Sequence, residues 1–287
     1  MSLDAAAFRN LLSRHDFAMV DRQAFDSEPW HEALPMTVLI PKELPDDEEK
    51  MPGLLTLSEL TDEQHERLFA NLQAARERRE VRLISCLLAV TGDPNRVALH
   101  MTRTLVMHTP TDRYLGRYFL RYFDPRVFVH LERIFPPTLL LHLYGPVVQW
   151  TIPFQDDWIT LLPPELPIWR KYWAMDAAQR QAVGRILRVN RVLTYWARNH
   201  GQWKNLDDFR AAAARVDRAL ERAANAYGMS SNDDLVAFAL HALTHGDDFY
   251  LRPAIARLLQ AVQQDKTIYY ADEARSLTNE DWSAAHS

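Results

Sequence analysis

The sequence predicts an α+β protein, in which an N-terminal mixed α/β lobe with a central sheet precedes a C-terminal all-helical bundle lobe. Most of the 16 prolines and several short apolar runs lie in the first 165 residues, whereas long helical periods fill the rest. Apolar residues make up 47% of the 287 residues, which is enough for a sizeable core. We therefore expect two domains, 1–165 and 166–287, with the tail from about residue 265 loosely held.

Short apolar runs bounded by Pro, Gly or Asp mark the strands of the first domain. The candidate strands are residues 17–20, 38–40, 81–90, 115–123 and 147–152. Helices are expected between them, at 62–79 and at 94–107. Thr61 and Gln64 have the capping-box spacing that opens the first of these helices. Strands separated by such helices predict a layered α/β arrangement.

The second domain carries the pattern of four antiparallel helices with short connections. Helix starts are expected near Asp176, Asn205, Ser231 and Pro253, since these residues suit N-terminal helix positions. The third helix is apolar nearly all round over residues 235–243, which is typical of a central, buried helix.

Charge and cysteine content limit the classes of function. The formal net charge of −5 gives no field that attracts a phosphate backbone, so we expect no nucleic-acid partner. Cys86 is the only cysteine and lies in an apolar run, where a core thiol is expected. The sequence shows no basic start followed by a long apolar run, and no span of about 18 uncharged apolar residues. These features predict a cytoplasmic protein with no membrane partner.

Catalytic patterns are nearly absent from the chain. The eight glycines are too far apart for a phosphate-binding loop, and no Gly-x-Ser-x-Gly elbow occurs. His241 and His245 have the i, i+4 spacing with which two imidazoles reach one metal ion, but Ala242 stands where a zinc protease needs glutamate. We predict no enzyme activity, no catalytic or metal site and no cofactor. The alternative is a metal-dependent hydrolase that uses these two histidines.

Arginines recur on single faces of two predicted helices of the second domain. Arg188, Arg191 and Arg198 share one face of the first helix, and a second stripe follows on the next helix. The second stripe consists of Arg215, Arg218 and Arg222. Such a stripe is usually solvated, but one that faces an acidic partner would be a docking surface.

The segment around Arg121 is the most distinctive part of the sequence. Residues 115–123 are apolar on both faces of an extended chain, which predicts an inner strand with Arg121 held by a carboxylate. Asp124 suits an N-cap and Pro125 a first helical turn, so a helix is expected at 125–134. The predicted scaffold motif consists of Arg121, Asp124, Pro125, Arg126 and Trp150.

The order of these features resembles the effector adaptors of bacterial type VI secretion. The matching order is an aromatic strand, Arg-Tyr-Phe-Asp-Pro-Arg at 121–126, a helix, and Tyr-Gly-Pro-Val-Val-Gln-Trp at 144–150. Residues 17–21, 52–57 and 97–103 look like further segments of that family. The resemblance covers about residues 17–150, and the insert at 26–51 departs from the family pattern.

The resemblance implies a cytoplasmic adaptor, or chaperone, that binds a secreted toxin effector and helps load it onto the secretion spike protein. Trp150, Phe154 and Trp158 are then hypothetical partner contacts near the junction of the two lobes, together with Arg188, Arg191 and Arg198. An alternative within the binding class is an immunity-type protein, which neutralises a toxin rather than delivering it.

Overall fold

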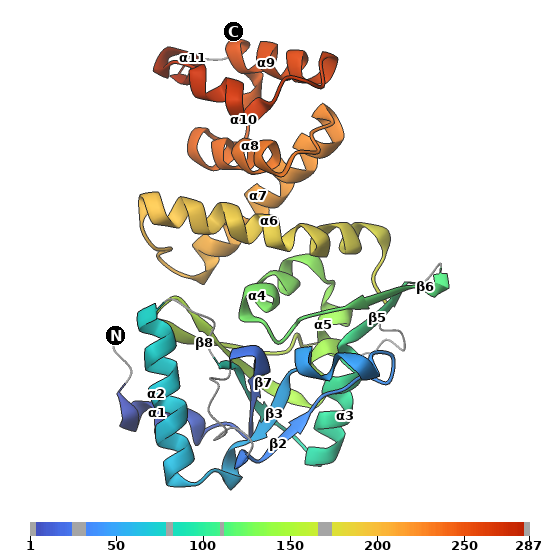
Figure 1. Cartoon of the computed structure of the whole chain (residues 1–287), viewed down its shortest axis with the longest axis vertical. Helices are drawn as coiled ribbons and strands as arrows, with labels where there is room; N and C mark the ends of the chain where they lie inside the picture. The colour runs from blue at the N-terminus through green and yellow to red at the C-terminus, as the bar shows by residue number, and fades with distance from the viewer. Residues whose placement is uncertain (1–3, 25–32, 79–82, 110–111, 166–173, 284–287) are drawn as a thin grey trace. The chain divides into compact units, whose positions relative to one another are not determined.

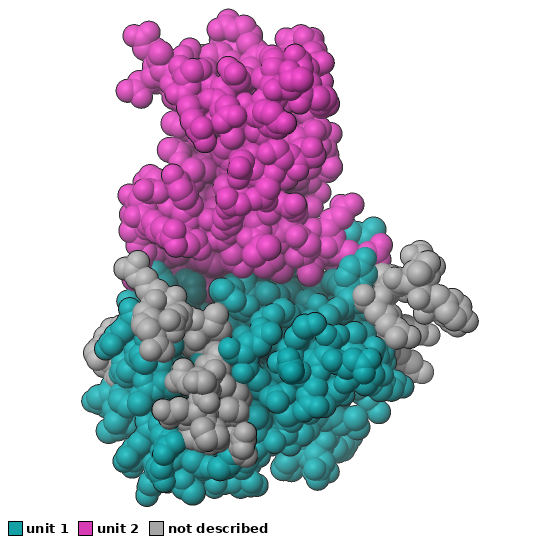
Figure 2. Space-filling view, in the orientation of Figure 1, with its two compact units in different colours: residues 1–177 teal, residues 178–287 magenta. Residues whose placement is uncertain are grey.

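The computed structural model describes residues 4–24, 33–78, 83–109, 112–165 and 174–283. The chain divides into two compact units, Met1–Ala177 and Ala178–Ser287, which Figure 2 colours separately. The first unit holds a sheet with helices and the second consists of helices, so the predicted α+β class is confirmed. The sequence placed this change near residue 165, next to residues 166–173, which lie outside the described residues.

A six-stranded antiparallel sheet forms the centre of the first unit (Figure 1). Its strand order is β2-β3-β1-β4-β7-β8, and every pair of neighbours is antiparallel. All four residues of β1 are buried, as expected for a strand between two others. The strands are β1 Phe17–Val20, β2 Met36–Val38, β3 Gly53–Thr56, β4 Ile84–Val90, β7 Val147–Phe154 and β8 Asp157–Leu161.

A separate two-stranded ribbon corrects the expected inner strand at 115–123. The ribbon pairs β5, Val106–Thr109, with β6, Asp112–Phe119, and it does not belong to the main sheet. The helix expected at 94–107 ends earlier, as α3 Pro94–Thr104, because its last apolar residues are used in β5. A short run such as Val106 and Met107 fits either a helix or a strand, so its tertiary partner decides.

Helices α1 Ala5–Leu12, α2 Asp62–Arg78, α4 Pro125–Ile134 and α5 Pro137–Tyr144 complete the first unit. The capping box of α2 is confirmed: Gln64 N donates to Thr61 Oγ1 at 3.2 Å, and Thr61 N donates to Gln64 Oε1 at 2.9 Å. The helix at 125–134 has the predicted bounds. Helix α1 was not predicted from the sequence, and it buries Phe8 and Leu12 one helical turn apart.

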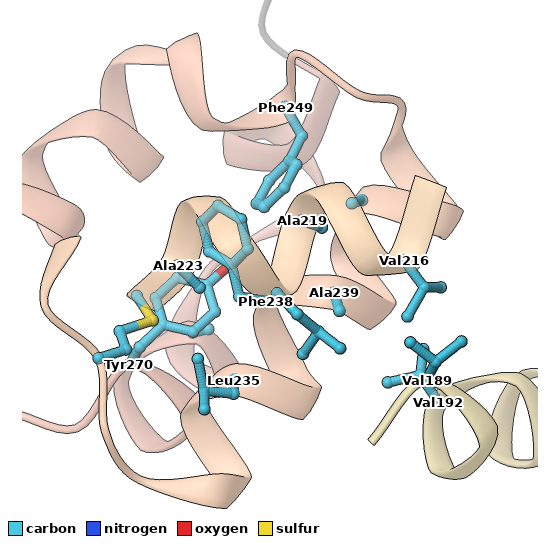
Figure 3. Close-up of a cluster of buried hydrophobic side chains, with 14 of the residues drawn as sticks. Val189, Val192, Val216, Ala219, Ala223, Leu235, Phe238, Ala239, Phe249 and Tyr270 are labelled. Carbon is cyan, nitrogen blue, oxygen red and sulfur yellow. The ribbon is translucent and has the colours of Figure 1, made fainter. Parts of the chain in front are cut away.

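The second unit contains the four predicted helices, which are α6 Ala177–His200, α7 Leu206–Tyr227, α8 Asn232–His245 and α9 Pro253–Gln264. Asn205 caps α7 through its side chain, and Gly228 ends it in the left-handed conformation at φ 64°. Helix α8 buries Leu235, Phe238 and Ala239 in the core shown in Figure 3, as predicted for a central helix. No helix in the described part of the chain is both long and apolar enough to cross a membrane.

The segment after residue 265 differs from the expected loose tail. It forms α10, Tyr270–Glu273, and α11, Asn279–Ser283. Tyr270 has no exposed surface, and Ala271 N donates to Asp234 Oδ1 of α8 at 2.8 Å. These short helices lack a long apolar period, so the sequence alone gave no sign that they pack on the bundle.

Candidate functional site

Arg121 lies just after β6 rather than inside a strand. Its Nη2 donates to Asp21 Oδ2 at 3.4 Å, and its Cζ lies 5.3 Å from the centre of the Phe123 ring. The Arg121 side chain is 38% exposed, whereas that of Asp21 is 12% exposed. The predicted carboxylate partner is therefore confirmed. The predicted burial in an inner strand is wrong, because the chain leaves the extended conformation after Phe119 and turns towards Asp124.

Asp124, Pro125 and Arg126 start helix α4. Asp124 Oδ1 accepts from Arg126 N at 2.9 Å, which is the N-cap that the sequence predicted. The Arg126 side chain binds the same carboxylate through Nε at 3.0 Å and Nη2 at 2.8 Å, and this bond raises the pKa of Arg126. Asp124 and Arg126 thus have a structural role at the start of α4.

Trp150 is the centre of an aromatic core in the first unit. Its ring stacks on Phe128 with 4.3 Å between ring centres, and the rings of Tyr122 and Tyr144 lie 5.8 Å away at 81° and 76° to its plane. The side chain has no exposed surface, so the suggested direct contact of Trp150 with a partner is corrected. Cys86 is equally buried, and burial raises the pKa of its thiol, as expected for a core cysteine.

Trp150, Phe154 and Trp158 do not form one surface. In the β7–β8 hairpin Trp158 is paired with Pro153, so it lies on the face of the sheet opposite to Trp150. Trp158 is half-buried and packs against the core cluster that includes Phe8. Phe154 is also half-buried. Of these three hypothetical partner contacts, Trp150 is buried in the core, while Phe154 and Trp158 each keep part of their surface exposed.

Two of the three arginines on α6 bind the first turn of α8. Arg188 Nε donates to Asn232 Oδ1 at 3.1 Å, and Arg191 Nη2 lies 3.4 Å from Asp233 Oδ1. Arg198 is exposed near the end of the helix. Two arginines of the predicted stripe thus make contacts within the second unit, and the third is exposed.

His241 and His245 belong to an aromatic cluster at the end of α8. His241 Nδ1 lies 2.7 Å from the Tyr270 hydroxyl oxygen, and the Trp282 ring stacks on His245 with 4.3 Å between ring centres. Burial lowers the pKa of His241 to about 4, so the imidazole is neutral at pH 7.

Metal ligands do not converge around these histidines. No group of three or more His, Cys, Asp or Glu side chains within the described ranges could hold a metal ion. Arg252 donates from Nη2 to the His245 carbonyl at 3.0 Å and from Nη1 to the Trp282 carbonyl. The histidine pair therefore takes part in attaching α11 to the bundle.

The first unit also contains a buried polar network around His15 that the sequence did not predict. His15 Nε2 lies 2.8 Å from Thr151 Oγ1 and 3.0 Å from Gln149 Nε2, and His15 Nδ1 lies 2.8 Å from the Leu11 carbonyl. A carbonyl accepts only, so Nδ1 carries the proton and Nε2 is the acceptor. Burial lowers the pKa of His15, which keeps the ring neutral as a tie between α1 and β7. His15 stands between Arg14 and Asp16 in the sequence, and this charged context gave no signal of a buried contact.

The arginines of α7 converge on a pocket in the second unit. Arg215 Nε and Arg218 Nη2 bind the two oxygens of Asp247 at 2.9 and 3.2 Å. The Cζ of Arg222 lies 4.1 Å from the centre of the Tyr250 ring. Together these side chains line a pocket of about 250 Å³. The sequence placed the arginines on one face, but it did not show that the loop after Gly246 folds back to meet them.

No family model matches the chain, and no curated protein or solved structure matches it.

Proposed function

We propose that this protein is a cytoplasmic adaptor that binds a secreted toxin effector of bacterial type VI secretion and helps load it onto the spike protein. The adaptor acts by binding, without a catalytic site or a cofactor. The proposal is carried by one observation, which is the order of features from the aromatic strand through Arg-Tyr-Phe-Asp-Pro-Arg at 121–126 to Trp150.

The contacts of this segment support a role as scaffold. Asp124 and Arg126 fix the start of α4, and Trp150 fills the core between α4 and α5. Residues whose side chains make these internal contacts identify the fold. Other residues must then form the cargo-binding surface. Such a division is what a binding protein needs, since its rigid core holds a surface that differs with the partner.

The remaining contact candidates are fewer than the sequence suggested. Trp150 is buried, while Arg188 and Arg191 bind the start of α8. Arg198 is exposed and forms no ion pair within the described residues, so it is the best of the α6 arginines for a contact with an acidic partner.

Co-purification from the native host tests the adaptor function. The tagged full-length chain should recover a large toxin and a spike component under gentle conditions. Recovery of neither protein would contradict the proposal. Arg198→Glu should weaken recovery of the toxin, whereas Arg96→Glu on α3, also at an exposed position, should leave it unchanged.

The hydrolase alternative has an independent test. Metal analysis of the purified protein should find no stoichiometric transition metal, because His241 already bonds Tyr270 and Trp282 stacks on His245. A bound metal that disappears in His241→Ala would favour the hydrolase instead. The same variant should retain partner recovery if the chain is an adaptor.

A further inference from the structure

We propose that the pocket between α7 and the loop after α8 binds a carboxylate side chain within a partner's peptide segment, next to an apolar side chain of that segment. The pocket lies wholly in the second unit. Arg215, Arg218 and Arg222 form one side of it, and residues 247–250 form the other. The inference rests on the proposed adaptor function only in taking this peptide segment to belong to the adaptor's protein partner.

Arg222 is the group that would meet the carboxylate. Its guanidinium lies over the Tyr250 ring, and it has no hydrogen bond or ion pair within the described part of the chain. A guanidinium stacked on a ring keeps its N–H edge available for a bidentate bond to a carboxylate. The stack also restricts the side chain before any ligand arrives, which lowers the entropy lost on binding.

The side chain of Asp247 shows that a carboxylate fits between the arginines of the pocket. Its two oxygens are held by Arg215 and Arg218 at 2.9 and 3.2 Å. Asp248 also lines the pocket, so three arginines and two aspartates leave one net positive charge. A singly charged carboxylate matches that charge. A phosphate group carries nearly two negative charges, so the pocket would neutralise only part of its charge.

The apolar surface of the pocket favours an apolar side chain next to the carboxylate. Phe238 and Phe249 lie under the pocket and have no exposed surface, as members of the core in Figure 3. The half-buried Tyr250 ring therefore supplies the apolar surface that a side chain beside the carboxylate would contact. Small-molecule sites usually enclose about 300–1,000 Å³, and this pocket of about 250 Å³ is below that range. It therefore suits individual side chains of a longer peptide better than a cofactor.

A displayed library of short linear peptides tests the proposal without knowledge of the natural partner. Selection on the wild-type chain should enrich peptides in which Asp or Glu adjoins an apolar residue. An enriched peptide is then synthesised with Glu or with Gln, and its binding is measured by fluorescence anisotropy. The Glu form should bind at least about tenfold more tightly, as expected for one charge-assisted hydrogen bond.

Matched variants locate the binding on this pocket. Arg222→Glu should abolish the difference between the Glu and Gln peptides, and Arg222→Lys should retain only part of it, because lysine lacks the planar fork. Arg257→Glu, at an exposed position on α9, makes the same charge change and should bind like the wild type. No acidic enrichment, or equal binding by Arg222→Glu and wild type, would overturn the proposal.

Failure of the pocket and failure of the adaptor function give different results. If Arg222→Glu still recovers toxin and spike protein but the peptides show no preference for Glu, the pocket proposal fails and the adaptor stands. If the Glu peptides bind through Arg222 but no toxin or spike component is recovered, the pocket stands and the adaptor fails.

Discussion

Arg121 and Arg126 lie close together in the chain but hold different parts of it. Arg121 reaches back to Asp21, 100 residues earlier, whereas Arg126 binds the carboxylate two residues before it. The local pair could be predicted from the helix-start pattern of Asp124 and Pro125. The distant partner could be predicted only as a carboxylate, because sequence spacing carries no information about which strand end lies nearby.

Arg121→Ala should destabilise the fold rather than selectively weaken partner binding. The substitution leaves the mostly buried Asp21 carboxylate without its cation, at a cost of about 1 kcal/mol after allowance for the partial exposure of Arg121. Thermal unfolding should show a decrease of a few degrees in melting temperature. Arg96→Ala, at an exposed position on α3, is the control and should show no change. An unchanged melting temperature with lost binding would reverse the assignment.

Gly145→Ala should destabilise the protein by about 3 kcal/mol. Gly145 has φ 54°, and a Cβ atom there would lie 2.2 Å from His100 Nε2. The ring would have to move and lose its hydrogen bond to the Leu143 carbonyl. Chemical denaturation measures the loss. Gly184→Ala in α6 is the matched control, since nothing lies within 4 Å of its Cβ position and alanine favours a helix. Equal stability of the two variants would contradict this account.

At the scale of elements, the helices were easier to predict than the strands. Helices α2 and α4 have capping residues that mark their first turn, and the structure confirms those starts. Strand β3 entered only through the family resemblance of residues 52–57. Strands β5 and β8 were missed because Val106–Thr109 continues a helical pattern and Asp157–Leu161 follows a turn at Gln155 with φ 53°. Short strands depend on their partners more than on their own sequence.

The partner-contact residues were the least predictable part. Trp150 and Phe154 share one face of strand β7, and only the register of β7 with β8 shows that Trp158 lies on the opposite face. In the same way, the i, i+4 spacing of His241 and His245 is correct for a helix face, but Trp282 occupies that face.

The attachment of α10 and α11 should weaken in acid. The pKa of His241 is lowered to about 4 in the folded protein from an ordinary 6.5, because the ring is buried and His245 is adjacent. Below pH 6.5 the unfolded chain binds a proton that the folded protein does not, so stability falls from pH 6.5 down to about pH 4.

A melting-temperature series over pH 4–8 measures this effect. His241→Leu removes the titrating group, so its melting temperature should decrease less between pH 6.5 and pH 4 than that of the wild type. The acidic decrease should be accompanied by faster hydrogen exchange in α10 and α11. Identical pH profiles for the two proteins would show that His241 is not the group responsible.

At the scale of the whole molecule, each unit has a separate basis for its fold. The first unit is centred on a sheet and the Trp150 cluster, and the second on the helical core around Phe238. The sequence predicted this division from proline distribution and helical periodicity, which are properties of long segments. It could not predict the pocket of Arg215, Arg218 and Arg222, because that pocket requires the loop after α8 to fold back onto α7.

Deletion of the gene in its host tests the adaptor function most directly. The account predicts that the deleted strain grows normally but no longer delivers the toxin, so neighbouring competitor cells survive and the toxin remains inside the producer. Restoring the wild-type gene should restore delivery. Death of the deleted strain by its own toxin would identify an immunity protein instead, and unchanged toxin delivery would contradict the adaptor function.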